Sequence, residues 1–442
     1  MLRRDAPRIR VRRVPTFDRE TAAGGYVGTY LDLSHLNLTL AITGGIVLLL
    51  GLVGGYIRNT FWISEPIVAT LVGIALGPAL LGIMPGIHPS THPGAFMHEL
   101  ARLTLALAVM SAAIRLPMTY ISDNWRSLTI VIGGGMIVMW LIGSILAAFC
   151  FSFGWMAALL VGAVVSPTDP VLAGVVTSGS IAERNIPGRI RHLLCAESGL
   201  NDGLAMVVVA LPMILMQHAD AAALSDWAIE IVLWEVIGGI VVGAAIGWVA
   251  MHLLKWSRRR ALSETHSTLT IGIALAVTTL AVVRLMGSDG ILAAFVAGAF
   301  LNRAIDDSER IHEHIQEAIG RFFILPIFLV FGAALPWQQW FSMGWPVLVF
   351  ALAVLCLRRM PLFLLLGKIV PDIHTRRETL FAGWFGPMGI SSLFYATLAV
   401  QETGFEQVWP ITALVVLASV VAHGITAMPL VRRISTDMCE ET

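Results

Sequence analysis

The chain carries little charge of either sign. Charged residues make up 13% of its 442 residues, whereas a soluble domain carries about 25%. The 29 basic residues balance the 29 acidic ones, so the sequence lacks the basic surface of a nucleic-acid-binding protein and no nucleic-acid partner is expected. With a mean hydropathy of +0.79, the composition excludes a separate soluble domain of any size.

Cysteine is also scarce. The four cysteines are scattered along the chain and show neither a disulfide framework nor the spacing of a metal site: Cys150, Cys195, Cys356 and Cys439. We therefore expect no cofactor. The basic N-terminus has no hydrophobic stretch directly behind it and no small-residue cleavage site, which argues against a signal peptide.

Long apolar runs are abundant instead. Hydrophobic residues make up 57% of the chain, in runs of roughly twenty residues, the length that crosses a bilayer. We expect an all-α polytopic membrane protein embedded in a lipid bilayer. Thirteen transmembrane helices are predicted, at about 38–57, 66–84, 97–114, 127–150, 155–178, 192–216, 228–254, 267–286, 289–303, 316–335, 345–367, 378–400 and 406–431. Residues 1–37 would be a polar N-terminal tail, 38–431 the transmembrane domain, and 432–442 a short cytoplasmic tail.

Lysine and arginine occupy every second loop between these predicted spans. The alternate loops contain neither residue: 85–96, 151–154, 217–227, 336–344 and 401–405. Because basic loops remain in the cytoplasm, the sequence predicts a cytoplasmic C-terminus, and an odd number of spans places the N-terminus outside. The expected location is the plasma membrane or a bacterial inner membrane.

The predicted span 155–178 contains a helix breaker, SPTDP. Pro167 and Pro170 lack an N–H and clash with the preceding turn, so the helix should come apart near Thr168 and Asp169. Unwound backbone at membrane depth is tolerated where it lines a cavity or is buried in protein. The Thr168 hydroxyl, the Asp169 carboxylate and the unpaired carbonyls are all hard oxygen ligands.

A second interruption is predicted in the span 378–400, where Gly386, Pro387 and Gly389 follow one another closely. Two interrupted helices at corresponding places in two halves are typical of a transporter site between inverted repeats. The breaks fall in the fifth and twelfth predicted spans. Two inverted repeats of six helices, joined by one linking helix, would bring these discontinuous helices into register.

A further acid, Asp202, lies in the next predicted span. A charge at bilayer depth costs several kcal/mol unless it is hydrated, paired or bound. Ser198 and Asp202 are four residues apart and share a helix face, so with Thr168 and Asp169 they could form an oxygen cage for a small monovalent cation or a proton. Two simpler interpretations stay open: Asp169 as a helix N-cap and Ser198 as a small packing residue.

These motifs carry a resemblance to a known family. SPTDPVLAGVV, followed by SIAERNIPGRIRHLLCAESGLNDGLA, resembles the signature of the monovalent cation:proton antiporters, in the branch with Asn-Asp in the sixth helix. LSHLNLTLAI, SEPIVATLVGIALGP, SDGILAAFVAGAF and GWFGPMGIS extend the match. The sequence is most similar to fungal plasma-membrane sodium/proton antiporters and their bacterial relatives, from Ser34 to about His423.

The resemblance implies a homodimer that exchanges Na+ or Li+, in some members K+, for H+ by elevator-type movement of a core domain. Asp202 would hold cation and proton in turn, with Thr168, Asp169 and Ser198 completing the ion site. Asn201 occupies the position linked to electroneutral exchange. Glu197 belongs to an ion pair whose partner in many relatives is an arginine of the twelfth helix. The matching residue here is Met388, which leaves two candidate partners, Arg358 and Arg359.

Several alternatives remain at this stage. A K+/H+ antiporter of the same fold fits the same residues. Asp169 and Asp202 could instead form the dyad of an intramembrane aspartyl protease, although GLND departs from the Gly-x-Gly-Asp motif of such enzymes. A channel is a third class. His312 and His314 could sense pH, but the acidic segment 306–318 is more simply a solvated loop. We expect a transporter that is not an enzyme.

Overall fold

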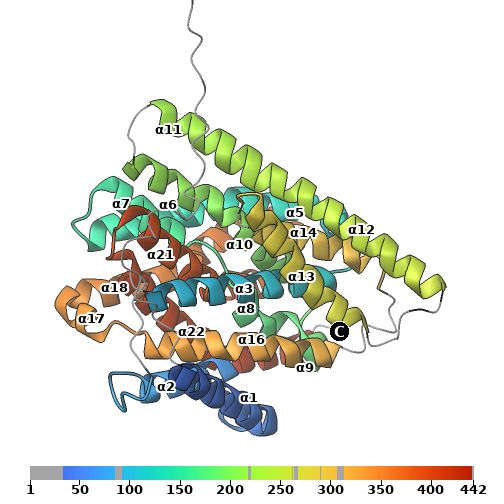
Figure 1. The fold of residues 1–442 in the computed structure, drawn as a ribbon, viewed down its shortest axis with the longest axis horizontal. Helices are drawn as coiled ribbons and strands as arrows, with labels where there is room; N and C mark the ends of the chain where they lie inside the picture. The colour runs from blue at the N-terminus through green and yellow to red at the C-terminus, as the bar shows by residue number, and fades with distance from the viewer. Residues whose placement is uncertain are drawn as a thin grey trace, which may run out of the picture.

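The structure is a computed structural model that describes residues 33–84, 92–217, 221–260, 262, 267–288, 290–305 and 313–440. Every regular element in these ranges is a helix (Figure 1). The first half of the chain contains α1 (Leu33–Phe61), α2 (Glu65–Leu76), α3 (His92–Arg115), α4 (Tyr120–Asp123), α5 (Trp125–Leu128), the π-helix η2 (Thr129–Gly135), α6 (Met136–Cys150), α7 (Trp155–Val164), α8 (Pro170–Thr177), α9 (Gly179–Asn185) and α10 (Gly188–Gln217). The second half contains α11 (Ala221–Asp226), the π-helix η3 (Trp227–Gly238), α12 (Gly239–Arg259), α13 (Ser267–Leu285), α14 (Ile291–Asn302), α16 (Glu313–Ala333), α17 (Trp337–Met343), α18 (Trp345–Leu357), α19 (Met360–Leu366), α20 (Arg376–Trp384), α21 (Ile390–Thr403) and α22 (Val408–Glu440).

The helices have the length and composition of a polytopic membrane protein. Within the described ranges, six helical segments are long and apolar enough to cross a bilayer. A seventh is counted if Phe322–Ala333 and Trp337–Met343, which meet at 55°, form one bent span. The prediction of an all-α protein with membrane-type helices is confirmed.

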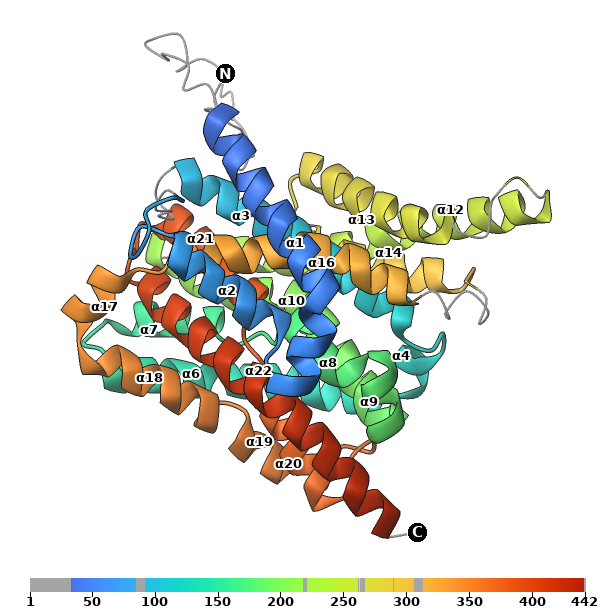
Figure 2. The same cartoon turned by 90° about the horizontal axis from the view of Figure 1, so that it is seen from below.

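The helices form one bundle with a crowded centre. In Figure 1, α1 and α2 lie along one edge, while α11 and α12 run along the opposite edge. Helices α3, α8 and α10 lie between these two edges, and Figure 2 shows α1 and α22 crossing the face seen from below. The edge helix α12 exposes large apolar side chains such as Val241 and Leu253, as expected for a surface that faces lipid.

Both predicted helix breaks are present. The first lies between α7, which ends at Val164, and α8, which begins at Pro170. The second lies between α20, which ends at Trp384, and α21, which begins at Ile390. In each case proline and glycine remove donors or permit close contacts that a continuous helix would not allow.

Several predicted boundaries differ from the structure. Helix α2 ends at Leu76, not near residue 84, because Gly77 and Pro78 stop the helix there. The span predicted for 345–367 is divided into α18 and α19 at Arg358 and Arg359, just before Pro361, whose missing N–H favours such a break. Helix α1 begins at Leu33 and α22 continues to Glu440, both beyond the predicted limits.

The rotation of α10, which carries Asp202, is fixed by two glycines. A Cβ atom on Gly199 would lie 2.6 Å from the Phe295 ring, and one on Gly203 would lie 2.7 Å from Leu292. Both neighbours belong to α14, and the two glycines are one turn apart on a single face. Close packing of small residues against α14 therefore determines which side chains of α10 face the helix breaks.

Candidate ion-binding site

The Asp169 carboxylate holds together the N-terminal ends of two half-helices. One oxygen, Oδ1, accepts hydrogen bonds from the backbone N–H groups of Val171 (2.7 Å) and Leu172 (3.1 Å) at the start of α8. The other, Oδ2, accepts the N–H of Ile390 at the start of α21. The Asp169 N–H donates to the Pro387 carbonyl at 2.8 Å. Because helix N-termini are partially positive, this carboxylate stabilises both breaks at once.

Arg358 joins the two breaks in the same way at the C-terminal ends of α7 and α20. Its Nη1 donates to the carbonyls of Val165 (2.7 Å) and Ser166 (2.6 Å), and a longer bond of 3.4 Å reaches the Pro167 carbonyl. Its Nη2 donates to the Gly386 carbonyl at 2.6 Å. A buried guanidinium thus satisfies carbonyls that α7 and α20 leave unpaired where they end, and its positive charge complements their negative ends.

Glu197 has a partner, and it is the second candidate arginine, Arg359. The two side chains form a bidentate ion pair in which Nη1 contacts Oε1 and Nη2 lies 2.7 Å from Oε2. Arg359 also donates from Nε to the Ala382 carbonyl at 2.9 Å. Gly386 makes room for this arginine, since a Cβ there would collide with the Arg359 side chain. The pair is buried, so it ties α10 to the second break.

Asn201 connects α10 to the first break. Its Nδ2 donates to the Thr168 hydroxyl at 2.8 Å, and its Oδ1 accepts the Thr168 N–H at 3.3 Å. Both side chains are buried. This reciprocal pair leaves one lone pair of the Thr168 hydroxyl available for a further ligand, while the neutral amide of Asn201 holds the unwound backbone through one donated and one accepted hydrogen bond.

The Asp202 carboxylate differs from every other acid at the site. It is completely buried, and neither of its oxygens has a hydrogen-bond partner within the described ranges. The hydroxyl of Ser391 lies beside it, although the two groups do not form a hydrogen bond of normal geometry. Its backbone carbonyl accepts the Tyr395 hydroxyl at 2.5 Å. A buried carboxylate without such partners is expensive as a bare charge.

Ser198 lies one turn before Asp202 on α10. Its hydroxyl donates to the Leu194 carbonyl at 2.7 Å, as serines inside helices often do. That bond uses the hydroxyl proton and leaves the oxygen lone pairs as acceptors. The packing interpretation and the ligand interpretation of Ser198 are therefore compatible.

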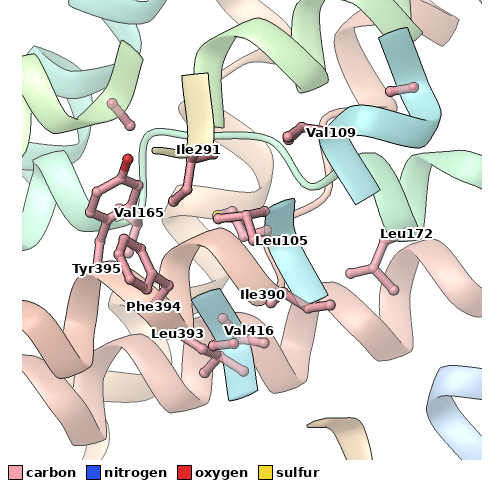
Figure 3. Close-up of a cluster of buried hydrophobic side chains, with 14 of the residues drawn as sticks. Leu105, Val109, Val165, Leu172, Ile291, Ile390, Leu393, Phe394, Tyr395 and Val416 are labelled. Atoms are coloured by element: carbon pink, nitrogen blue, oxygen red, sulfur yellow. The ribbon is translucent and has the colours of Figure 1, made fainter. Parts of the chain in front are cut away.

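A buried apolar cluster and a cavity both lie near these groups. Figure 3 shows Leu105 of α3 and Leu172 of α8 in one buried cluster with Ile390, Leu393, Phe394 and Tyr395 of α21. A cavity of about 440 Å³ extends between α2, α3, α8, α16 and α22 and reaches the first residues of α8. Pro170, Val171 and Leu172, in the first turn of the helix that Asp169 caps, line this cavity.

Comparison with known proteins identifies the family to which the chain belongs. The profile of the sodium/hydrogen exchanger family, transmembrane part, matches residues 27–433. The chain belongs to the sodium/hydrogen exchanger family. The resemblance seen in its motifs is confirmed.

Curated relatives of this chain include fungal and bacterial proteins. A probable Na(+)/H(+) antiporter of Schizosaccharomyces pombe is 31% identical over 92% of this chain and 58% of its own length. The Na(+)/H(+) antiporter of Saccharomyces cerevisiae is 29% identical over 89% of this chain and 43% of its own length. The chain therefore spans about half the length of these two fungal relatives. The K(+)/H(+) antiporter NhaP2 of a Shewanella strain is 24% identical over 73% of this chain.

A solved structure shows the same fold. The sodium proton antiporter MjNhaP1 from Methanocaldococcus jannaschii superposes with a TM-score of 0.68 at 19% identity, over 90% of this chain and 99% of the other. An identity this low speaks for the fold alone.

Asp169 and Asp202 are not hydrogen-bonded to each other as the two acids of an aspartyl protease dyad would be. In such a dyad two carboxylates lie close enough to share a proton. Here both Asp169 oxygens accept backbone N–H groups, and no hydrogen bond joins Asp169 to Asp202. The curated relatives are named as antiporters, which are transporters and not enzymes.

The break in α20–α21 is also held by residues that the sequence did not single out. The Met388 N–H donates to the Ser419 hydroxyl at 2.8 Å, and the His423 ring bonds the Trp384 carbonyl through Nε2 at 3.0 Å. Ser419 and His423 are one turn apart on α22, and such a polar pair inside an apolar span is the signal that would have pointed to them. His312 lies outside the described residues, as does the side chain of His314, so their proposed pH sensing stays a prediction.

Gly389 is expected to tolerate no side chain. A Cβ there would collide with the Asp169 carboxylate and approach Leu172 within 2.9 Å. We expect Gly389→Ala to lower the melting temperature of the purified protein, by overpacking worth about 1–3 kcal/mol. Gly239→Ala is the matched control, since a Cβ at Gly239 meets nothing within 4 Å. Equal melting temperatures of the two variants would contradict the close approach of α21 to Asp169.

Proposed function

We propose that this exchanger moves one monovalent cation, Na+ or Li+, against one proton, and that Asp202 binds the two in turn. The observation that carries the proposal is the Asp202 carboxylate itself, buried between two broken helices without a hydrogen-bond partner within the described ranges. Such a group is stable only when a proton or a cation neutralises it. Because one carboxylate cannot hold both, binding of one ion requires release of the other.

The exchange is proposed to be electroneutral. Of the three acids Asp169, Glu197 and Asp202, the last has available oxygens, since backbone N–H groups occupy Asp169 and Arg359 neutralises Glu197. Asn201, beside Asp202 in the chain, carries no charge. One charge enters the site for each charge that leaves it, so the ion gradients and not the membrane potential would drive transport.

The architecture of the transport cycle is part of the same proposal. We infer thirteen transmembrane spans in two inverted six-helix repeats, a homodimer, and elevator-type movement of the core that contains both breaks. The protein would lie in the plasma or inner membrane, with the C-terminus in the cytoplasm and the N-terminus outside. Arg115, at the end of α3 in the predicted cytoplasmic set of basic residues, lines the cavity that reaches α8, which supports cytoplasmic access to the site.

A second candidate is K+/H+ exchange through the same residues. It is supported by the similarity to a relative named as a K(+)/H(+) antiporter. The ligands are all oxygens, and selection between cations then depends on how many oxygens contact the ion and how firmly they are held. The two candidates share one mechanism and differ in the cation.

The test is ion exchange by purified protein in liposomes loaded with a pH-sensitive dye. After the liposome lumen is made acidic, Na+ or Li+ added outside should drive protons out of the lumen. The rate should be the same whether the membrane potential is clamped or left free. A response to K+ equal to that for Na+ would select the second candidate. A rate that changes with the potential would contradict one-for-one exchange, and ion current without proton movement would indicate a channel.

A further inference from the structure

A second buried polar group without a partner lies next to Asp202. The Ser391 hydroxyl, in the first turn of α21, is completely buried and has no hydrogen-bond partner within the described ranges. It lies beside the Asp202 carboxylate, whose oxygens are also unpartnered. Buried polar atoms are normally hydrogen-bonded, so two adjacent exceptions on facing helices require an explanation.

The register of α21 places this hydroxyl on the side of the two acids. Tyr395 lies four residues after Ser391 and therefore on the same helix face, and its hydroxyl donates to the Asp202 carbonyl at 2.5 Å. The preceding residue, Ile390, donates its N–H to Asp169. The face of α21 that begins at Ser391 is thus held against Asp202 by hydrogen bonds on either side of it.

We propose that Ser391 is a further ligand of the cation that binds at Asp202, and that it contributes to the choice of cation. This inference rests on the proposed function, because it names a ligand of the same ion. A serine hydroxyl is a hard oxygen that can turn its lone pairs to a cation and its proton to a carboxylate. The Ser391 hydroxyl can therefore bind at the site both when a cation is present and when Asp202 carries a proton.

The other oxygens near the site are more restricted. The Ser198 hydroxyl donates its hydrogen bond to the Leu194 carbonyl, and the Asp169 carboxylate accepts hydrogen bonds from three backbone N–H groups. The Ser391 hydroxyl makes no such bond within the described ranges, so its orientation is open. A smaller ion gains more from each oxygen that contacts it, so removal of this ligand should weaken Li+ and Na+ binding more than K+ binding.

The neighbouring serine provides a matched control. Ser392 is also completely buried and without a hydrogen-bond partner in the described chain. It follows Ser391 directly, so it is rotated by about 100° around the helix and lies on a different face. The two Ser→Ala variants remove the same atom from the same turn of α21.

Two measurements test the proposal. In proteoliposomes, Ser391→Ala should raise the KM for Na+ and Li+ by about tenfold, with a smaller rise for K+, while Ser392→Ala stays within about twofold of wild type. Ser391→Thr, which keeps the hydroxyl, should stay close to wild type. In detergent, added Na+ should raise the melting temperature of wild type and Ser392→Ala, and raise that of Ser391→Ala less.

The outcomes separate this inference from the proposed function. Equal KM values and equal Na+ stabilisation for the two alanine variants would overturn the role of Ser391 and leave antiport intact. Wild type could exchange no protons and yet show a rise in melting temperature with Na+ that depends on Ser391. That result would support Ser391 as a cation ligand and contradict the antiport mechanism. If Na+ had no effect in either measurement, both proposals would fall.

Discussion

Asp202→Asn should abolish cation-driven proton movement without unfolding the protein. Asparagine has nearly the shape of aspartate but cannot carry the charge that balances a cation or accept the transported proton. The rate should therefore fall by at least about 100-fold. Since the carboxylate is buried without hydrogen-bond partners in the described chain, its neutral replacement should also leave the melting temperature unchanged or raise it.

The measurement combines the dye assay with thermal unfolding of the same preparation. Asp123→Asn is the control, because Asp123 is an exposed acid on the short helix α4, and it should behave as wild type in both measurements. If Asp202→Asn still exchanged ions, the transported charge would have to reside on Asp169 or Glu197. A large fall in melting temperature would indicate that Asp202 has a structural partner.

Arg358→Met should have the largest effect on stability. Methionine fills a similar volume but donates no hydrogen bond, so the carbonyls of Val165, Ser166 and Gly386 would remain buried and unpaired. Each such group costs about 1–3 kcal/mol, and together they should lower the melting temperature by about 5 °C or more. Exchange should be lost as well, because the unwound backbone on both sides of the ion site depends on this one side chain.

Two variants make this result interpretable. Arg433→Met removes an arginine that is exposed on α22, and it should unfold like wild type. Arg358→Lys keeps the charge, but a single ammonium group cannot reach both breaks as the planar guanidinium does, so it should fall between Arg358→Met and wild type. Equal unfolding of Arg358→Met and Arg433→Met would show that other groups satisfy these carbonyls.

The two helix breaks were predictable because proline and glycine act locally. Pro167, Pro170 and Pro387 remove backbone donors wherever the chain places them, and no tertiary contact restores an N–H that is absent. The end of α2 carried a similar signal in Gly77 and Pro78, which the apolar run around them obscured. Local chemistry thus located the two helix breaks, and hydropathy alone misjudged one helix end.

The assignment of the two arginines was not predictable. Arg358 and Arg359 are adjacent, have the same charge, and differ only in the direction in which each leaves the backbone where α18 ends. Arg359 pairs with Glu197, and Arg358 donates to the carbonyls of both breaks. Which arginine takes which partner depends on how segments distant in the sequence pack. Ser391 carried no signal for the same reason, since its importance comes entirely from the position of Asp202 on another helix.

Asp169 shows why two interpretations of one residue could not be separated beforehand. Its position before Pro170 predicted a cap of α8, and the structure has that cap. The third bond, to Ile390, comes from a helix more than two hundred residues later. This bond makes Asp169 a shared anchor of two helices, which neither the capping pattern nor the ion-ligand hypothesis predicted.

Each half of the chain supplies a charged side chain that stabilises a helix break in the other half, and this has a consequence for how the protein is made. The first half supplies Asp169, which caps a helix of the second half, and the second half supplies Arg358, which satisfies carbonyls of the first. During synthesis the first broken helix must therefore wait, with unpaired backbone that lipid cannot satisfy, until α18 to α21 have entered the membrane. Assembly of the ion site is then a late step of biogenesis, and the nascent first half depends on water, the insertion machinery or a chaperone to cover its break.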